Sequence, residues 1–148
     1  MPNPLQSPRS MSLGLLLARL PLGALFCIAG YRKLAGLGLA SFVSEHLKSV
    51  PRYMPPWFPK VFLNGLPFAE MGLGALIILG LFTRLSAFLT SALLISFMMI
   101  MGIQDSTFPF HPNLLFLGNA LLLFFAGAGS ISIDSRLFGQ KSGGFSKH

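Results

Sequence analysis

The sequence predicts an all-α integral membrane protein, a four-helix bundle whose termini lie on the same side of the membrane. Two observations carry this prediction. Hydrophobic residues make up 53% of the 148 positions and charged residues only 10%, whereas soluble domains carry about 25% charge. The apolar residues are also gathered into four runs that approach or reach the length needed to cross a hydrocarbon core of roughly 30 Å. The mean hydropathy of +0.69 agrees with both observations.

The four spans are expected within one membrane domain that covers residues 11–136. At about 1.5 Å of rise per residue, each run gives a helix close to the thickness of the core. Because consecutive spans cross in opposite directions, an even number of them leaves both termini on one side. The spans are placed at about 11–31, 61–82, 85–102 and 113–128, with an interfacial loop at 34–60, a disordered tail at 1–10 and a flexible tail at 137–148.

The first span shares features with a cleaved signal peptide, because Arg9 precedes its apolar stretch. Arg19, however, interrupts the apolar region that a signal peptide needs, and bulky Phe26 beside Cys27 is a poor cleavage context. We therefore expect this segment to be retained as a membrane span.

The connection at 34–60 combines two patterns that suit the membrane surface. Residues 40–50 place apolar side chains on one side at helical spacing, which predicts a short amphipathic helix in the headgroup plane. The segment that follows places Tyr53, Trp57 and Phe58 among prolines and cations, a composition typical of an interfacial aromatic belt.

Arg19 and Glu70 are the two charges that lie well inside predicted spans. An ionised carboxylate at mid-bilayer costs at least about 2.5 kcal/mol on insertion scales, so it is protonated, paired with a cation, or facing water inside the bundle. We expect Arg19 and Glu70 to meet, since Gly23 and Gly74, one turn further on, let the two helices approach. The tilt of helix side chains toward the N-terminus opposes this pair, because the two helices run in opposite directions.

A second set of candidate residues lies at helix ends or at polar positions within spans. Lys33 and Arg84 are expected to extend to the interface as topology anchors. Asn119, inside the fourth span, is expected to bond to a neighbouring helix. The remaining candidates at helix ends or interfaces are His111, Asn113 and Asp134.

The composition limits the chemistry of the chain. Cys27 is the only cysteine, which excludes an intrachain disulfide, a four-thiolate metal site and a CxxC redox pair. No nucleophile–base set, nucleotide-binding loop or metal-ligand cluster is visible, so we expect no catalytic residue, no metal, no intrinsic cofactor and no activity of the chain alone. The net charge of +7 suits membrane topology and anionic headgroups rather than nucleic acid.

Three motifs, taken in order, resemble the DoxX family of small membrane proteins. They are R-x3-G-x6-G-x2-K at 19–33, A-E-x-G-x-G-A-L-I-I-L-G-L-x-T-R at 69–84, and N-L-L followed by G-A-G-S-I-S-I-D at 113–134. The resemblance covers nearly all of the chain between the tails and implies a four-helix membrane bundle. Some relatives are the small membrane subunit of a thiosulfate:quinone oxidoreductase or partner redox enzymes in membrane complexes, and others are orphans. Many relatives have an acidic residue where this chain has His111.

Two functional interpretations of different classes follow. The first is an accessory or anchor subunit of a membrane-associated redox complex, with quinone as a candidate ligand and Arg19 and Glu70 placed to bond its carbonyl or handle its protons. The second is a small transporter or an ion- or proton-conducting bundle in which Glu70 binds a cation or proton. A purely structural membrane subunit, in which the buried pair only locks two helices, is the third alternative.

The expected surroundings of the chain follow from the same patterns. Its partners are the lipid bilayer and other protein subunits, with a homo-oligomer as an alternative, and its location is the cell membrane. We expect cytoplasmic termini, because the loop at 104–112 carries no Lys or Arg and therefore suits export.

Overall fold

The computed structural model of this chain describes residues 8–36, 38–48, 55, 57–102 and 113–137. Every regular element in this part of the chain is a helix. The elements are α1 (Pro8–Tyr31), the π-helical turn η2 (Arg32–Gly36), α2 (Leu39–Leu47), α3 (Trp57–Leu79), α4 (Thr83–Gly102), α5 (Asn113–Ala126) and α6 (Ile133–Leu137).

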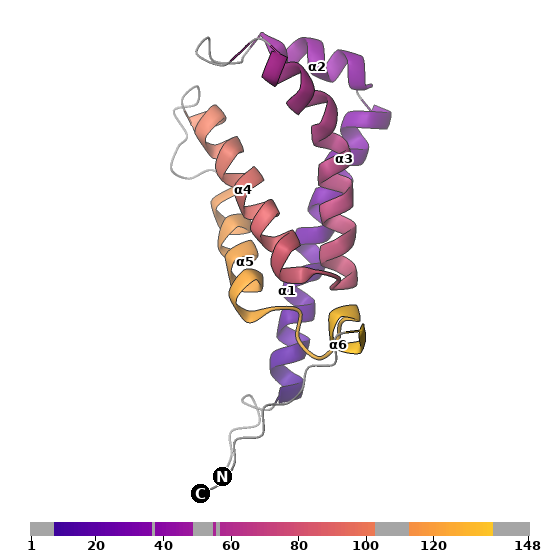
Figure 1. Ribbon diagram of the computed structural model, residues 1–148, viewed down its shortest axis with the longest axis vertical. Coiled ribbons are helices and arrows are strands. Elements are labelled where there is room, and N and C mark those ends of the chain that lie inside the picture. Colours follow the sequence, from indigo (N-terminus) through magenta and orange to yellow (C-terminus); the bar gives the residue numbers. More distant parts are fainter. Residues whose placement is uncertain (1–7, 37, 49–54, 56, 103–112, 138–148) are drawn as a thin grey trace, which may run out of the picture.

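The long helices pack as two antiparallel pairs. Helix α1 lies along α3, and α4 lies along α5, while α3 also contacts α4 and α1 also contacts α5 (Figure 1). The short helix α2 lies across one end of the α1 and α3 pair, and α6 lies at the opposite end, beside the turn that joins α3 to α4 (Figure 1).

The contact between α1 and α3 depends on glycine. A side chain at Gly23 would place its Cβ 2.7 Å from the carbonyl oxygen of Gly74, and a Cβ at Gly74 would lie 2.6 Å from the carbonyl oxygen of Gly23. A Cβ at Gly30 would likewise meet the carbonyl oxygen of Pro67 at 2.5 Å. The predicted close approach of the first two spans at Gly23 and Gly74 is confirmed, because only small residues let helix backbones come this near.

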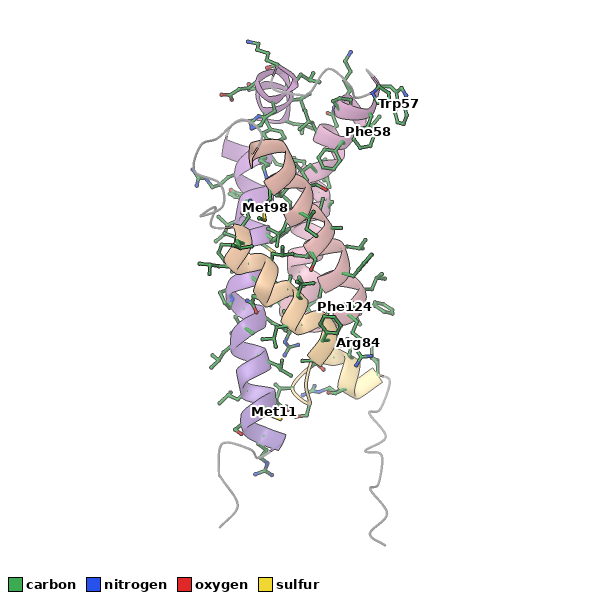
Figure 2. The ribbon with its side chains drawn as sticks, turned by 90° about the vertical axis from the view of Figure 1, so that its left-hand side faces the viewer. Met11, Trp57, Phe58, Arg84, Met98 and Phe124 are labelled. Atoms are coloured by element: carbon green, nitrogen blue, oxygen red, sulfur yellow. The ribbon has the colours of Figure 1, made fainter. Side chains whose placement is uncertain are left out.

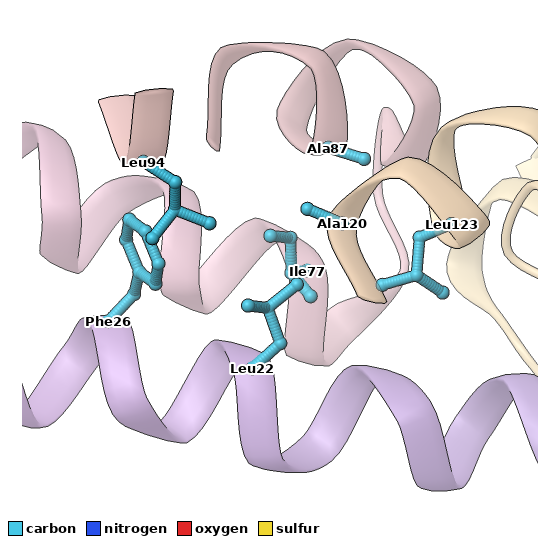
Figure 3. Packing of buried hydrophobic residues seen from close by; sticks show 7 residues of the cluster. All are labelled: Leu22, Phe26, Ile77, Ala87, Leu94, Ala120 and Leu123. Atoms are coloured by element: carbon cyan, nitrogen blue, oxygen red, sulfur yellow. The ribbon is translucent and has the colours of Figure 1, made fainter. Parts of the chain in front are cut away.

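The main core lies where the two helix pairs meet. Figure 3 shows how side chains from four helices converge there, with Leu22 and Phe26 of α1 opposite Ile77 of α3. The other buried members are Ala87 and Leu94 of α4 and Ala120 and Leu123 of α5. The small side chains Ala87 and Ala120 stand beside large ones here, so that α4 and α5 can come close to the other two helices.

A second apolar cluster joins α2 to α3. Phe42 of α2 is buried against Leu63 and Leu66 of α3, and Val43 and Leu47 pack at the edge of the same cluster. The polar side chains of α2, among them Glu45 and His46, are exposed. The predicted amphipathic helix therefore forms at 39–47, with its apolar side on α3.

The helix bounds differ from the predicted spans by a few residues. Helix α1 begins at Pro8, so residues 8–10 are helical although we placed them in the tail. Proline suits this first position because its missing N–H has no partner in the first turn of a helix. Helix α3 begins at Trp57, so Trp57 and Phe58 open a span rather than close the preceding loop.

The α3 helix ends at a tight turn that leads directly into α4. Gly80 and Phe82 both adopt positive φ, at 66° and 47°. Glycine tolerates this conformation, whereas Phe82 is held in it by contacts described below. The turn takes residues 80–82 out of the predicted second span.

The lengths and surfaces of the helices suit a membrane. Helices α1 and α3 are long and apolar enough to cross it, whereas the apolar parts of α4 and α5 are shorter. Large apolar side chains are exposed on the outer faces of the helices, including Leu17, Ile28, Phe88, Leu115 and Phe125. Trp57 and Phe58 lie at one end of the molecule and Met11 and Arg84 toward the other (Figure 2).

Candidate functional site

An ion pair between Lys33 and Glu70 lies inside the molecule. The ammonium group of Lys33 donates to both carboxylate oxygens of Glu70, with 2.6 Å between Nζ and Oε2 and a closer contact to Oε1. Only 2% of the Glu70 side chain is exposed, against 20% of the Lys33 side chain. The carboxylate is therefore enclosed, and the ammonium group is the part of the pair that a ligand can approach.

Two aromatic rings from different helices flank the ammonium group. Lys33 Nζ lies 5.6 Å from the ring centre of Phe42 on α2 and 5.7 Å from that of Phe97 on α4. Each distance is within the range of a cation–π interaction. The pair with its two rings, Lys33, Glu70, Phe42 and Phe97, is called the Lys33 site below.

The predicted pair between Arg19 and Glu70 is wrong, although both residues are buried as expected. The direction of helix side chains explains the error. Lys33, in η2 just after α1, extends back toward the middle of α1, and Glu70 extends toward the start of α3, so these two side chains converge. Arg19 extends toward the start of α1, away from Glu70.

Arg19 is instead held at the opposite end of the molecule. Its Nη2 donates to the carbonyl oxygen of Ile131, and its Nη1 lies so close to Gly80 that a Cβ there would collide with it. The side chain is 0% exposed, and its Nε and Nη1 have no hydrogen-bond partner in the described part of the chain. Glycine at position 80 is therefore needed for space as well as for its positive φ.

Asp134 binds the start of α4. Its Oδ1 accepts from the backbone N–H of Phe82 at 2.7 Å, and its Oδ2 accepts from that of Thr83 at 2.8 Å. Its own N–H donates to the carbonyl oxygen of Gly80 at 2.9 Å. The carboxylate satisfies N–H groups that have no partner within α4, and its charge opposes the positive end of the helix dipole.

The segment that follows α5 also contacts α1. The backbone N–H and the hydroxyl group of Ser130 both bond to the hydroxyl oxygen of Ser12, at 3.1 and 2.7 Å. Asn119 of α5 donates from Nδ2 to the carbonyl oxygen of Ala18 at 2.9 Å. The expectation that Asn119 bonds to a neighbouring helix is therefore confirmed.

The remaining predicted residues stand apart from the Lys33 site. Arg84 is exposed in the first turn of α4, and Asn113 begins α5. His111 lies outside the described residues. The structure thus contains two separate polar centres. In one, Glu70 pairs with Lys33; in the other, Arg19 bonds to the segment that leads to Asp134.

Sequence reasoning missed three parts of these centres. It treated Lys33 as an anchor, and it gave no role to Phe97 or to the carbonyl group of Ile131. The tilt of helix side chains toward the N-terminus was the available signal for Lys33 and Glu70. In two antiparallel helices that cross, the residues on the C-terminal side of the crossing point in each helix tilt back toward that point, and their side chains therefore converge. A backbone carbonyl leaves no such signal in a sequence.

The match to a known family adds to this geometry. The sequence model of the DoxX family matches residues 14–103, which is more than half of the chain. The chain belongs to the DoxX family. No curated protein and no solved structure matches the sequence. DoxX membership, together with helices able to span a bilayer, identifies the chain as a small membrane protein.

The region matched by the DoxX model contains every residue of the Lys33 site. It also contains Arg19 and Gly80, but Ile131 and Asp134 lie beyond it. The Lys33 site is thus built entirely from the DoxX region, whereas the Arg19 centre needs the last part of the described chain.

Proposed function

We propose that this DoxX-family protein is an accessory or anchor subunit of a membrane-associated, quinone-linked redox complex. Its four spans are α1, α3, α4 and α5, and both termini face the cytoplasm. The observation that carries the proposal is the Lys33 site, an ion pair enclosed by apolar helices and flanked by two aromatic rings.

The residues of this site fit a quinone carbonyl. An ammonium group has three N–H donors, and Lys33 uses two of them on the Glu70 oxygens. This leaves one donor on a nitrogen that lies 5.6 and 5.7 Å from the ring centres of Phe42 and Phe97. A planar, mostly apolar ring with a carbonyl acceptor matches such surroundings, because the aromatic side chains would contact the ring and the ammonium group would donate to its carbonyl.

A bound quinone supplies two-electron chemistry that is coupled to protons. The part played by this chain is to hold the ring and to keep water from its faces. Glu70 is the proton-accepting group that Lys33 contacts directly. Electrons come from a partner subunit, so the chain has no turnover alone.

The ion pair also favours a second candidate, a structural role. Lys33 follows directly on α1 and Glu70 lies within α3, so the pair links these two helices at the end where α2 covers them. The transporter alternative receives less support, because Glu70 is already neutralised by Lys33 and offers no free carboxylate to a cation.

Purification from native membranes in mild detergent tests the proposal. The parent protein, Lys33→Met and Lys60→Met are purified in parallel, with extracted quinone measured by chromatography and attached proteins by mass spectrometry. Lys60 is the matched control because it is an exposed lysine of α3. The parent and Lys60→Met are expected to retain a redox enzyme subunit and quinone, and Lys33→Met to lose about tenfold in quinone, since hydrogen bonds to charged groups contribute about 1.5 kcal/mol or more.

The double variant Lys33→Met with Glu70→Leu separates binding from folding. Replacing a buried ion pair by apolar residues keeps a fold stable, so this variant is expected to keep its attached subunit and lose the quinone. A parent that carries neither a redox subunit nor quinone contradicts the proposal. If the parent and the double variant retain equal amounts of quinone, the Lys33 site does not bind it, and the structural role of the ion pair is the one supported.

A further inference from the structure

A groove lies at the end of the molecule opposite the Lys33 site. It has a volume of about 600 Å³ and runs between the start of α4 and the segment that follows α5. One wall consists of residues 82–85 and the other of residues 126–129, with Ser132, Asp134 and Ser135 at its base. Both walls thus belong to segments that Asp134 ties together through the N–H groups of Phe82 and Thr83.

Two polar groups of this groove have no partner in the described part of the chain. Arg84 is exposed, and its guanidinium group lies over Gly127, where a Cβ would be 3.7 Å from Nε. Thr83 is only 1% exposed, and its hydroxyl group makes no hydrogen bond. Because the hydroxyl oxygen of Thr83 is itself enclosed, Arg84 is the one of these two groups that a ligand can reach.

The charges around the groove favour an anion. Arg84 lies in its wall, and the buried Arg19 stands behind its base beside Ser132. Asp134 is the one carboxylate among the lining residues, and its two oxygens are already bound to backbone N–H groups. An arginine at the edge of a groove is suited to phosphate, which its planar group can bind through two parallel N–H donors.

The apolar part of the groove favours a lipid over a free anion. Phe82 and Leu85 are exposed in one wall, and the small residues Ala126 and Ala128 form part of the other. The walls continue into the lipid-facing surface of the bundle, where Phe88 and Leu122 are exposed. Arg84 lies toward the end of the molecule that carries Met11 (Figure 2), so a phosphate at Arg84 lies at headgroup level with acyl chains along α4 and α5.

We propose that this groove binds one anionic phospholipid, with its phosphate on Arg84. The site is separate from the proposed quinone function, since it lies at the other end of the molecule and shares no residue with the Lys33 site. The lipid connects α4 to the segment after α5, the two parts of the chain that form the groove.

Native mass spectrometry with added lipid tests this site. The detergent-purified protein is titrated with phosphatidylglycerol and, separately, with phosphatidylcholine of the same acyl chains. The parent is expected to retain one phosphatidylglycerol in preference to phosphatidylcholine. Arg84→Gln is expected to weaken this binding about tenfold, in line with the loss of a charge-assisted hydrogen bond.

Arg32→Gln is the matched control, because Arg32 is an exposed arginine in η2 at the opposite end of the molecule. It is expected to bind phosphatidylglycerol as the parent does, and thermal unfolding of Arg84→Gln in detergent is expected to match the parent. Equal binding of the two lipids by the parent, or equal losses in Arg84→Gln and Arg32→Gln, overturns the proposal. Displacement of the lipid by millimolar inorganic phosphate also overturns it, because the site then recognises a free anion.

Discussion

Lys33 and Glu70 neutralise one another, and this decides how substitutions at either residue behave. Glu70→Gln keeps the shape of the side chain but leaves the Lys33 ammonium group without a counter-charge in an apolar interior. Removing one partner of a buried pair costs about 3 to 5 kcal/mol. Because Lys33 keeps 20% exposure, we expect a loss near the lower end, about 3 kcal/mol in the free energy of unfolding.

Thermal unfolding in detergent measures this loss, and a double variant provides the control. Lys33→Met with Glu70→Leu is expected to unfold within about 1 kcal/mol of the parent, since an apolar pair needs no counter-charge. A Glu70→Gln variant as stable as the parent would show that the ion pair contributes nothing to the fold.

Asp134 is expected to act on α4 through the two N–H groups that it accepts. Asp134→Ala leaves the N–H groups of Phe82 and Thr83 without this acceptor, and loss of such a cap costs about 1 to 2 kcal/mol. Hydrogen exchange at residues 82 and 83 is expected to become faster, while exchange in the middle of α3 stays unchanged. Uniformly faster exchange along α3 and α4 would instead mean that Asp134 supports the whole fold.

At the scale of the helix pair, Gly74 controls the distance between α1 and α3. In Gly74→Ala the new Cβ would lie 2.6 Å from the carbonyl oxygen of Gly23 and 2.8 Å from the backbone nitrogen of Cys27. Both are backbone atoms, so the helices must move apart. We expect a loss of about 2 to 3 kcal/mol in the free energy of unfolding, as found for overpacked cores.

Gly72→Ala is the control for Gly74→Ala, since nothing lies within 4 Å of a Cβ at this exposed position of the same helix. Alanine has the higher helix propensity, so Gly72→Ala is expected to be neutral or to stabilise by up to about 1 kcal/mol. Equal stabilities of the two variants would contradict close packing of α1 and α3.

Hydropathy and glycine spacing predicted the helices and one of their contacts, but not how the charges pair. The apolar runs placed four helices to within a few residues, and Gly23 and Gly74 identified the face that α1 turns to α3. Arg19 and Glu70 were paired because they lie at similar depths. The depth of a residue in the membrane follows from counting residues, whereas its pairing depends on the direction of its side chain. The partner of Arg19 is a backbone carbonyl group, which every residue has, so the sequence does not identify it.

For the molecule as a whole, the proposed topology puts α2 and α6 on opposite sides of the membrane. Cysteines introduced as Ser41→Cys in α2 and Arg136→Cys in α6, both at exposed positions, report on this in a Cys27→Ser background. A membrane-impermeant thiol reagent applied to intact cells is expected to label the first and not the second. Labelling of both cysteines from one side would contradict the three spans, α3, α4 and α5, that separate α2 from α6.

The bond from Arg19 to Ile131 joins the first helix to a residue 112 positions later in the chain. During synthesis, α1 therefore enters the membrane with a charged group whose partner has not yet left the ribosome. Glu70 is synthesised before Ile131, but its side chain points toward Lys33 and away from Arg19, so it does not neutralise Arg19. Until residues 130–134 are made, an arginine near the middle of this span costs about 2.5 to 3.5 kcal/mol on insertion scales, which a polar or protein-lined environment would reduce. The first span therefore reaches its final surroundings only after a segment 112 residues further along the chain has been made.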